Sequence, residues 1–257
     1  MRRLLVIGVG AGDPDYVTAQ AVQALNEVDV FFVVEKGGNA DELAALRRGI
    51  LERFVEDSSS YRIVAVPDPS RDRTTPAYTA AVDDWRERRA ATWEAALREE
   101  LGEDGIGAFL VWGDPSLYDS TIDVVERILA AGRVQLDYEV IPGVSAVHAL
   151  TARHRIALNR VGGAVQITTG RRLAADGWPE GVDDVVVMLD ADCSFERLDP
   201  TGVEIHWGAY LGTPDELLVS GPLAEAGPEI QLVRAQARAR KGWIMDTYLL
   251  RRSRSHE

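Results

Sequence analysis

Three short loops rich in glycine and proline each follow an apolar run of the chain. They are residues 12–14 (Gly-Asp-Pro), 113–115 (Gly-Asp-Pro) and 142–145 (Pro-Gly-Val-Ser). Ligands of open parallel sheets sit outside the carboxyl ends of the strands, and glycine lets the backbone approach a ligand closely there. We therefore expect the three loops to form the walls of one small-molecule site.

Each loop also has a purely structural interpretation. Asp114 can orient an ammonium or hydroxyl group while the N–H of Gly113 approaches the ligand, or it can cap an ordinary β-turn. Residues 8–12 are similar to a phosphate loop, but their spacing is not Gly-x-Gly-x-x-Gly and Pro14 interrupts the expected helix, so a tight turn fits them equally well. Ser145 can cap the following helix or donate to a ligand.

Strands alternating with helices must position these loops. Short β-branched or aromatic runs predict strands at residues 3–9, 28–34, 61–66, 107–112 and 138–141. Apolar residues at helical spacing predict helices at residues 17–26, 40–54, 78–101 and 120–131. Continuously apolar strands indicate a sheet that is buried on both faces, and the alternation indicates a doubly wound parallel sheet.

The pattern changes after residue 160, where short strands are joined by Gly- and Pro-rich links. We expect strands at residues 165–169, 184–189, 204–211, 229–235 and 243–251. The α/β chain is thus predicted to have two α/β domains, an N-terminal domain with a parallel doubly wound sheet over residues 1–158 and a C-terminal domain with a mixed sheet over residues 159–257.

Composition excludes several classes of function. The 257 residues carry 41 acidic and 28 basic side chains, a formal charge of −13, which argues against nucleic acid or an anionic membrane surface as a partner. No apolar run approaches the roughly 20 residues that cross a bilayer. Cys193 is the only cysteine, so we expect neither a disulfide nor a metal site, and a cytoplasmic location.

The motifs together resemble a known family. Residues 6–14 with Thr18, residues 113–115 and residues 142–145 are similar to the signatures of the S-adenosylmethionine-dependent tetrapyrrole methylases, and the resemblance covers nearly the whole chain. Further similarity points to a cobalamin-pathway subgroup, in residues 112–121 (WGDPSLYDST), 152–160 (ARHRIALNR), 167–173 (ITTGRRL) and 186–190 (VVMLD).

This resemblance implies the tetrapyrrole methylase fold, with a cofactor cleft between its two domains, a homodimer and a precorrin as the tetrapyrrole substrate. The implied reaction methylates precorrin-5 at C1 and releases its acetyl group as acetate, with S-adenosyl-L-methionine as methyl donor and S-adenosyl-L-homocysteine as product. Matching positions imply cofactor contacts from Gly10, Ala11, Trp112, Gly113, Asp114, Leu117, Ser145, Ala146, Met188, Leu189 and Leu211. Ala11 is a departure, because many relatives have proline there.

Methyl transfer from a sulfonium to carbon needs alignment and exclusion of water, but no side-chain nucleophile. Loss of an acetyl group would in addition benefit from a general base and an oxyanion donor. The candidates near the loops or the matching strand are His148, Tyr118, Asp13, Tyr16 and Asp190. His148 could instead be a packed helix residue, and Asp13 a turn cap.

A substrate with many carboxylates requires arginines in the site of an acidic protein. The candidates are Arg71, Arg73, Arg153, Arg155, Arg160, Arg171 and Arg172. Several could simply balance neighbouring acids on the surface. Arg171 and Arg172 follow a predicted strand end, which favours them.

Other functions stay open at this point. A neighbouring precorrin or a protein substrate, as in a diphthine-synthase-like methylase, would suit the same family. A nicotinamide-dependent oxidoreductase would use residues 8–12 as a dinucleotide loop, although the glycine spacing speaks against it. A protein that binds a tetrapyrrole without turnover would have similar residue types.

Overall fold

A computed structural model describes residues 1–35, 40–70 and 78–253 of the chain. It divides into two compact units, one of residues 1–10 and 14–144 and one of residues 11–13 and 145–257. Sequence analysis placed the boundary at residue 158. The division after Val144 assigns helix α5 (Ala146–His154) to the second unit, because α5 packs against strands of that unit.

The first unit is built on a parallel sheet. Within the described residues it has five strands in the order β3-β2-β4-β1-β5. The strands are β1 (Arg2–Gly8), β2 (Val30–Glu35), β3 (Arg62–Pro67), β4 (Ile106–Val111) and β5 (Leu136–Ile141). All neighbouring strands are parallel, which confirms the predicted doubly wound sheet.

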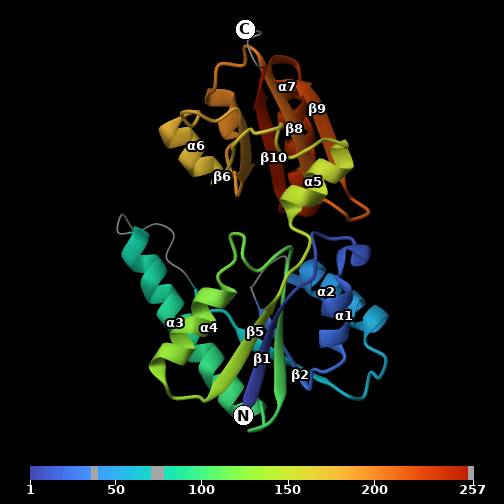
Figure 1. The fold of residues 1–257 in the computed structure, drawn as a ribbon, viewed down its shortest axis with the longest axis vertical. Coiled ribbons are helices and arrows are strands. Elements are labelled where there is room, and N and C mark those ends of the chain that lie inside the picture. The colour runs from blue at the N-terminus through green and yellow to red at the C-terminus, as the bar shows by residue number, and fades with distance from the viewer. Residues whose placement is uncertain (36–39, 71–77, 254–257) are drawn as a thin grey trace. The chain divides into compact units, whose positions relative to one another are not determined.

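Helices cover both faces of this sheet (Figure 1). Leu4 and Val6 of β1 pack in a cluster with α3 (Tyr78–Glu100) and α4 (Thr121–Ala131), whereas Leu5 and Ile7 face α1 (Ala19–Leu25) and α2 (Ala40–Phe54). Successive residues of a strand point to opposite faces, so a strand covered on both sides must be apolar throughout. This is why the apolar runs predicted the strands of this unit well.

The second unit contains a mixed sheet, as predicted. In the described part of the chain its strand order is β6-β7-β10-β8-β9. The strands are β6 (Val165–Thr169), β7 (Asp184–Met188), β8 (Val203–Ala209), β9 (Leu217–Pro222) and β10 (Asp246–Arg252). Only β6 and β7 pair in parallel, and the other pairs are antiparallel.

Helices lie on both faces of the mixed sheet. Helix α5 packs against β8, β9 and β10, while α7 (Leu223–Lys241) packs against β8 and β9. Helix α6 (Gly170–Asp176) follows β6 and contacts the 3-10 turn η2 (Ser194–Arg197). Another 3-10 turn, η1 (Pro14–Tyr16), precedes α1 in the first unit.

The strand predicted at residues 229–235 is wrong, because this segment lies within α7. Ile230 and Leu232 alternate with polar residues as in a strand, but the buried positions of the helix are Leu223, Ala226, Gly227, Ile230, Arg234 and Ala237. These buried positions are spaced three, four or seven residues apart, as on one face of a helix. Strand β9, which pairs with β8, was not predicted at all.

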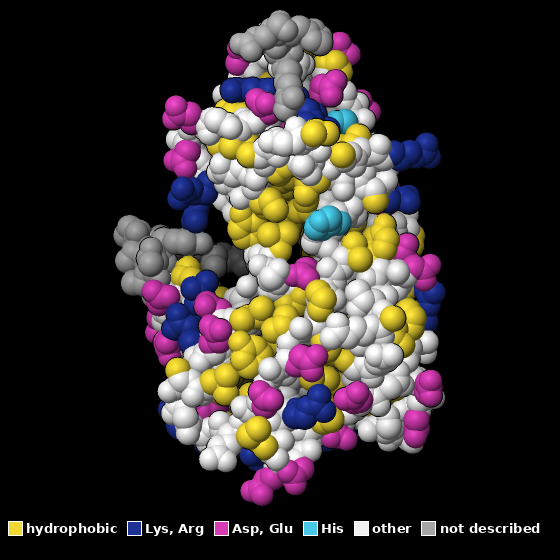
Figure 2. All heavy atoms as spheres, viewed as in Figure 1, with side chains coloured by type: hydrophobic (Ala, Val, Ile, Leu, Met, Phe, Trp, Pro, Cys, Tyr) yellow, Lys and Arg dark blue, Asp and Glu magenta, His cyan; other side chains and the backbone are white. Residues whose placement is uncertain are grey.

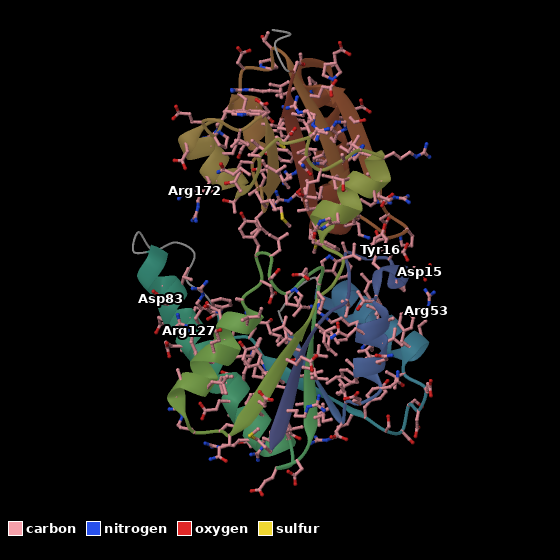
Figure 3. The ribbon with its side chains drawn as sticks, in the orientation of Figure 1. Asp15, Tyr16, Arg53, Asp83, Arg127 and Arg172 are labelled. Atoms are coloured by element: carbon pink, nitrogen blue, oxygen red, sulfur yellow. The ribbon has the colours of Figure 1, made fainter. Side chains whose placement is uncertain are left out.

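Charged side chains of both signs are scattered over the visible face of the protein (Figure 2). Some form exposed ion pairs between helices, such as Arg127 of α4 with Asp83 of α3 at 3.4 Å, and Arg53 of α2 with Asp15 (Figure 3). Exposed pairs of this kind contribute little stability. None of the described helices combines the length and apolar character that a membrane span requires.

Candidate functional site

The three predicted loops follow adjacent strands of the first unit. Strands β4, β1 and β5 are neighbours and all parallel, so their carboxyl ends lie at the same edge of the sheet. Ligands of open parallel sheets bind beyond this edge. Hydrogen bonds there join Gly10, which precedes the first predicted loop, to the second loop, and the second loop to the third. We call residues 8–10, 113–116 and 142–143 the loop junction.

Main-chain hydrogen bonds link the first two loops of the loop junction. The N–H of Gly10 donates to the carbonyl oxygen of Gly113 at 3.2 Å, and the N–H of Gly113 donates to the carbonyl oxygen of Gly10 at 2.8 Å. The N–H of Gly113 is therefore not aimed at a ligand, which corrects that part of the expectation. The bridge holds the strand ends of β1 and β4 together beyond the sheet.

The Asp114 carboxylate links the second loop to the third. Its Oδ2 accepts from the N–H of Gly143 at 2.9 Å, and its Oδ1 accepts from the N–H of Ser116 at 2.8 Å and from the Ser116 hydroxyl. The bond to the residue two positions further on makes Asp114 the local turn cap that was one of its two interpretations. Asp114 thus fixes the loop junction.

Asp114→Asn is expected to destabilise the first unit by about 1–3 kcal/mol, because an amide has one acceptor oxygen where two sets of donors need acceptors. Chemical denaturation measures the loss. Asp137→Asn, at an exposed position of β5, is the matched control and should change the free energy of unfolding by less than about 0.5 kcal/mol. Equal denaturation midpoints for the two variants would contradict the bridging role.

Close packing of main chain completes the loop junction. A Cβ added at Gly8 would lie 2.6 Å from the amide nitrogen of Gly143, and one added at Gly143 would lie 2.2 Å from the carbonyl oxygen of Gly113. Real Cβ atoms do not approach backbone so closely, so only glycine fits at these two positions. The loops form one rigid wall at the carboxyl edge.

Two large side chains at candidate positions occupy an unusual backbone region. In the first unit, Tyr118 has φ 52° and is 45% exposed; in the second unit, Leu189 has φ 53° and is 65% exposed at the end of β7. Such conformations cost roughly 1–3 kcal/mol and are concentrated at functional sites. Burial raises the pKa of Tyr118, so its phenol is a proton donor rather than a base at neutral pH.

Ser145 and His148 form a pair at the start of α5. Ser145 is the N-cap, since its Oγ accepts from the N–H of His148 at 3.4 Å, and the same Oγ lies 2.8 Å from Nδ1 of the His148 ring. Ser145 is 5% exposed, whereas His148 is exposed. The pair fixes the orientation of an imidazole whose other ring nitrogen, Nε2, is available to a reactant.

Asp190 lies in a buried hydrogen-bond network. Its Oδ2 accepts from the Tyr248 hydroxyl and the N–H of Ser194, both at 2.6 Å, and its Oδ1 accepts from the Ser194 hydroxyl at 2.9 Å and the N–H of Asp192 at 3.1 Å. Asp190 is 6% exposed. A carboxylate with both oxygens bonded and covered has a structural role here.

The other candidates lie at loops and strand ends. Tyr16 is the last residue of η1 (Figure 3). It packs closely against Gly10, since a Cβ added at Gly10 would lie 2.5 Å from the Cβ of Tyr16. Asp13 is partly buried in the second unit. The remaining cofactor candidates are buried or partly buried at Ala11, Trp112, Leu117, Ala146, Met188 and Leu211. The described residues contain no cluster of His, Cys, Asp or Glu that could hold a metal ion.

Several candidate arginines already pair with acids. Arg153 bonds Glu216 at 2.6 Å, Arg160 bonds Asp184 at 3.3 Å, and Arg172, visible on α6 in Figure 3, bonds Asp176 at 3.1 Å. Arg155 and Arg171 are exposed, whereas Arg71 and Arg73 lie outside the described residues. A different arginine, Arg47 of α2, has its guanidinium at the carboxyl edge of the first sheet, and no sequence motif marks it.

Fold and site together define the class of protein. Residues 3–227 match the family model of the tetrapyrrole (corrin/porphyrin) methylases, and the chain belongs to this family. A parallel sheet followed by a mixed sheet, with the loop junction at the edge of the first, is its tetrapyrrole methylase fold.

Particular relatives are closely similar. A precorrin-6A synthase (deacetylating) of Sinorhizobium sp. is 51% identical over 252 residues, which cover 98% of this chain and 96% of the relative. The crystal structure of a cobalamin-synthesis-related protein, CobF, from Corynebacterium diphtheriae is 37% identical with a TM-score of 0.84, covering 98% of this chain and 99% of that one. A uroporphyrin-III C-methyltransferase of Thermus thermophilus, solved in complex with S-adenosylhomocysteine, is 18% identical with a TM-score of 0.58 over 96% of each chain, and shows the fold alone.

Proposed function

We propose that this protein is an S-adenosylmethionine-dependent C-methyltransferase of cobalamin biosynthesis, which methylates precorrin-5 at C1, releases acetate and forms precorrin-6A. The observation that carries the proposal is the 51% identity to a precorrin-6A synthase (deacetylating) over 98% of the chain. An alignment of such length covers the loop junction, the start of α5 and the end of β7 alike.

The residues present suit S-adenosylmethionine. An adenosyl group needs apolar contact for its ring and close approach of backbone around it. The chain offers the exposed Leu189 side chain and a loop junction in which Gly8 and Gly143 leave main chain without a covering side chain. When bound, the cofactor supplies an electrophilic methyl group. The residues proposed to hold it are Gly10, Ala11, Trp112, Gly113, Asp114, Leu117, Ser145, Ala146, Met188, Leu189 and Leu211.

The rigid loop junction supports the proposal because alignment is the main demand of methyl transfer. A displacement at carbon requires donor and acceptor to be held in line and water to be kept away from them. The Gly10–Gly113 bridge and the Asp114–Gly143 bond keep three loops from moving independently. Their contribution is to hold a fixed surface against which the reactants are oriented.

Release of acetate requires a base, and we propose His148 for it. The proposal requires the tautomer in which Nδ1–H donates to Ser145 Oγ, 2.8 Å away. The free electron pair of His148 then lies on Nε2, which can take a proton from water. The resulting hydroxide adds to the acetyl carbonyl, and the carbon–carbon bond to the ring breaks. Acetate departs, and the electron pair stays on the ring carbon, which is the nucleophile that methylation needs.

His148→Gln is expected to reduce the rate of acetate release by roughly 10²–10⁴-fold, the range typical of a lost general base, while the Kd for S-adenosylmethionine changes little. Acetate quantification and calorimetric titration of the cofactor measure the two effects. His154→Gln is the control on the same helix, since the His154 ring bonds the carbonyl of Trp207 and packs against the ring of His206, and neither residue is a candidate of the site. Acetate release at the wild-type rate by His148→Gln would exclude His148 as the base.

The proposed reaction is tested by incubating the purified protein with S-adenosylmethionine and precorrin-5, and following product mass and acetate together. The expected product has gained one methyl group and lost one acetyl group, with acetate appearing in step. Methyl gain without acetate would assign the protein to another precorrin. Absence of turnover of precorrin-5 despite cofactor binding would overturn the proposal.

We also propose a homodimer in the cytoplasm. The family resemblance supports the dimer, and a single cysteine supports a reducing compartment. Light scattering on the full chain gives the molar mass, and a value of one chain's mass at assay concentrations would exclude the dimer.

A further inference from the structure

Strands β2 and β4 separate before they reach the carboxyl edge of the first sheet. Strand β2 pairs with β3 over its whole length from Val30 to Glu35, but its pairing with β4 ends at Phe32–Phe109. Strand β4 continues to Val111 with β1 only. The helices that follow β2 and β4 belong to clusters on opposite faces of the sheet. This is a topological switch point, where open α/β sheets bind ligands.

Arg47 of α2 lies at this separation. Its Nε donates at 3.3 Å to the carbonyl oxygen of Leu110, the residue of β4 just beyond the end of the β2 pairing. The carbonyl oxygen of the next residue, Val111, accepts from Val9 beyond β1 instead. The guanidinium thus donates the hydrogen bond to Leu110 that β2 would donate if its pairing with β4 continued. Its two terminal nitrogens, Nη1 and Nη2, bond none of the described residues.

No carboxylate in the described part of the chain forms a direct ion pair with Arg47. Burial lowers its pKa, while the charge of Asp119 acts in the opposite direction from further away. An arginine does not lose its proton in a protein, so the half-buried guanidinium keeps its charge, and the more distant Asp119 offsets the cost of burial only in part. Unsatisfied charge at a ligand-binding edge is typical of a functional site.

The two fully buried arginines of the described chain do not share this property. Arg89 of α3 pairs with Asp68 at 3.0 Å, donates to the Ser120 hydroxyl at 2.8 Å and lies 4.8 Å from the ring centroid of Trp93. Arg234 pairs with Asp246 at 2.8 Å. In both, a carboxylate of the chain itself supplies the anion that Arg47 is missing.

We propose that Arg47 forms an anion subsite in the crevice between β2 and β4 and binds a carboxylate side chain of the substrate. This inference rests on the proposed function in one respect, namely that the substrate is a corrin precursor bearing carboxylates. A carboxylate offers two oxygens to the planar fork of Nη1 and Nη2, which is the strongest pairing of these groups. A bound carboxylate would also be a direct ion-pair partner for Arg47, which the described residues do not provide although the chain has a formal charge of −13.

The test compares Arg47→Gln with Arg48→Gln, the exposed neighbour on the same helix. Binding is measured with uroporphyrin I, a porphyrin whose side chains are carboxylic acids, by fluorescence titration at low and physiological salt. Arg47→Gln is expected to weaken binding 10–100-fold, in line with the loss of a charge-assisted pair, whereas Arg48→Gln binds as wild type does. Equal affinities of Arg47→Gln and wild type would overturn the subsite.

Two further readouts separate this inference from the proposed function. With precorrin-5, Arg47→Gln is expected to raise KM 10–100-fold and change kcat less than about threefold, because the carboxylate is bound equally before and during reaction. The melting temperature should change little, because loss of the hydrogen bond to Leu110 and relief of a half-buried charge act in opposite directions; a large drop would assign Arg47 a structural role instead. If wild type binds uroporphyrin I but does not turn over precorrin-5, the proposed function fails and the subsite stands.

Discussion

Gly143→Ala is expected to lower the free energy of unfolding by roughly 1–3 kcal/mol, the typical range for forced overpacking, and to abolish S-adenosylmethionine binding. The new Cβ would lie 2.2 Å from the carbonyl oxygen of Gly113 and 2.9 Å from the carbonyl carbon of Gly8. Both atoms belong to main chain at the ends of paired strands, so no side-chain rotation relieves the clash. The loops must separate, and the Asp114–Gly143 bond breaks with them.

Chemical denaturation and calorimetric titration with the cofactor measure both effects. Gly49→Ala is the matched control, because Gly49 lies in α2 with nothing within 4 Å of the added Cβ. Alanine is favoured over glycine in a helix interior, so this variant should gain about 0.5–1 kcal/mol and bind cofactor normally. A Gly143→Ala protein with wild-type stability and affinity would show that the loop junction is not rigid.

The centre of the first sheet could be predicted from sequence because its strands β1 and β4 are covered on both faces, whereas the edge strands β3 and β5 carry exposed residues. Every residue of such a strand must be apolar, so the run itself marks the strand, as in Leu4, Leu5, Val6 and Ile7 of β1. The three loops could be placed for the same reason: each motif directly follows a run that parallel pairing brings to the same edge. Helix and strand ends differ from prediction by only a few residues.

The second unit shows where the same reasoning stops. Antiparallel strands and a helix against one face of a sheet both give alternating or mixed patterns, and Ile230, Leu232 and Val233 fit either. The face that α7 buries extends from Leu223 to Ala237, longer than any window of a few residues reveals. Strand β9 has two polar or glycine positions, Ser220 and Gly221, and is recognisable only by its pairing with β8.

For the candidate site, too, the sequence predicts some features and not others. The sequence could mark the motif positions as candidates, but it does not contain the contacts that they make: Gly113 bonds Gly10 across a hundred residues, and Asp114 bonds Gly143. Arg47 could not be found at all. Nothing in an amphipathic helix distinguishes an arginine that faces a gap between two strands from its exposed neighbour Arg48.

Asp190→Ala is expected to cost about 3–5 kcal/mol of stability in the second unit, as for other broken buried charge networks. It leaves the Tyr248 hydroxyl, the N–H of Ser194 and the Ser194 hydroxyl without their acceptor, and Tyr248 is 1% exposed. Burial raises the pKa of Tyr248, and the Asp190 charge raises it further, so the hydroxyl stays a donor at any working pH and needs an acceptor. Asp192→Ala, an exposed control two residues away, should change stability by less than about 0.5 kcal/mol.

Asp190→Asn separates the structural role from the catalytic one that sequence alone left open. An asparagine keeps the shape and one acceptor oxygen, so it should lose less stability than alanine, and turnover per folded molecule should stay near that of wild type. A base would behave in the opposite way, with stability retained and acetate release lost. Both oxygens of Asp190 already accept hydrogen bonds from Tyr248, Ser194 and Asp192, so neither has a lone pair positioned for water. Measured side by side with His148→Gln, the two variants should therefore show opposite patterns: Asp190→Asn less stable but active when folded, and His148→Gln stable but unable to release acetate.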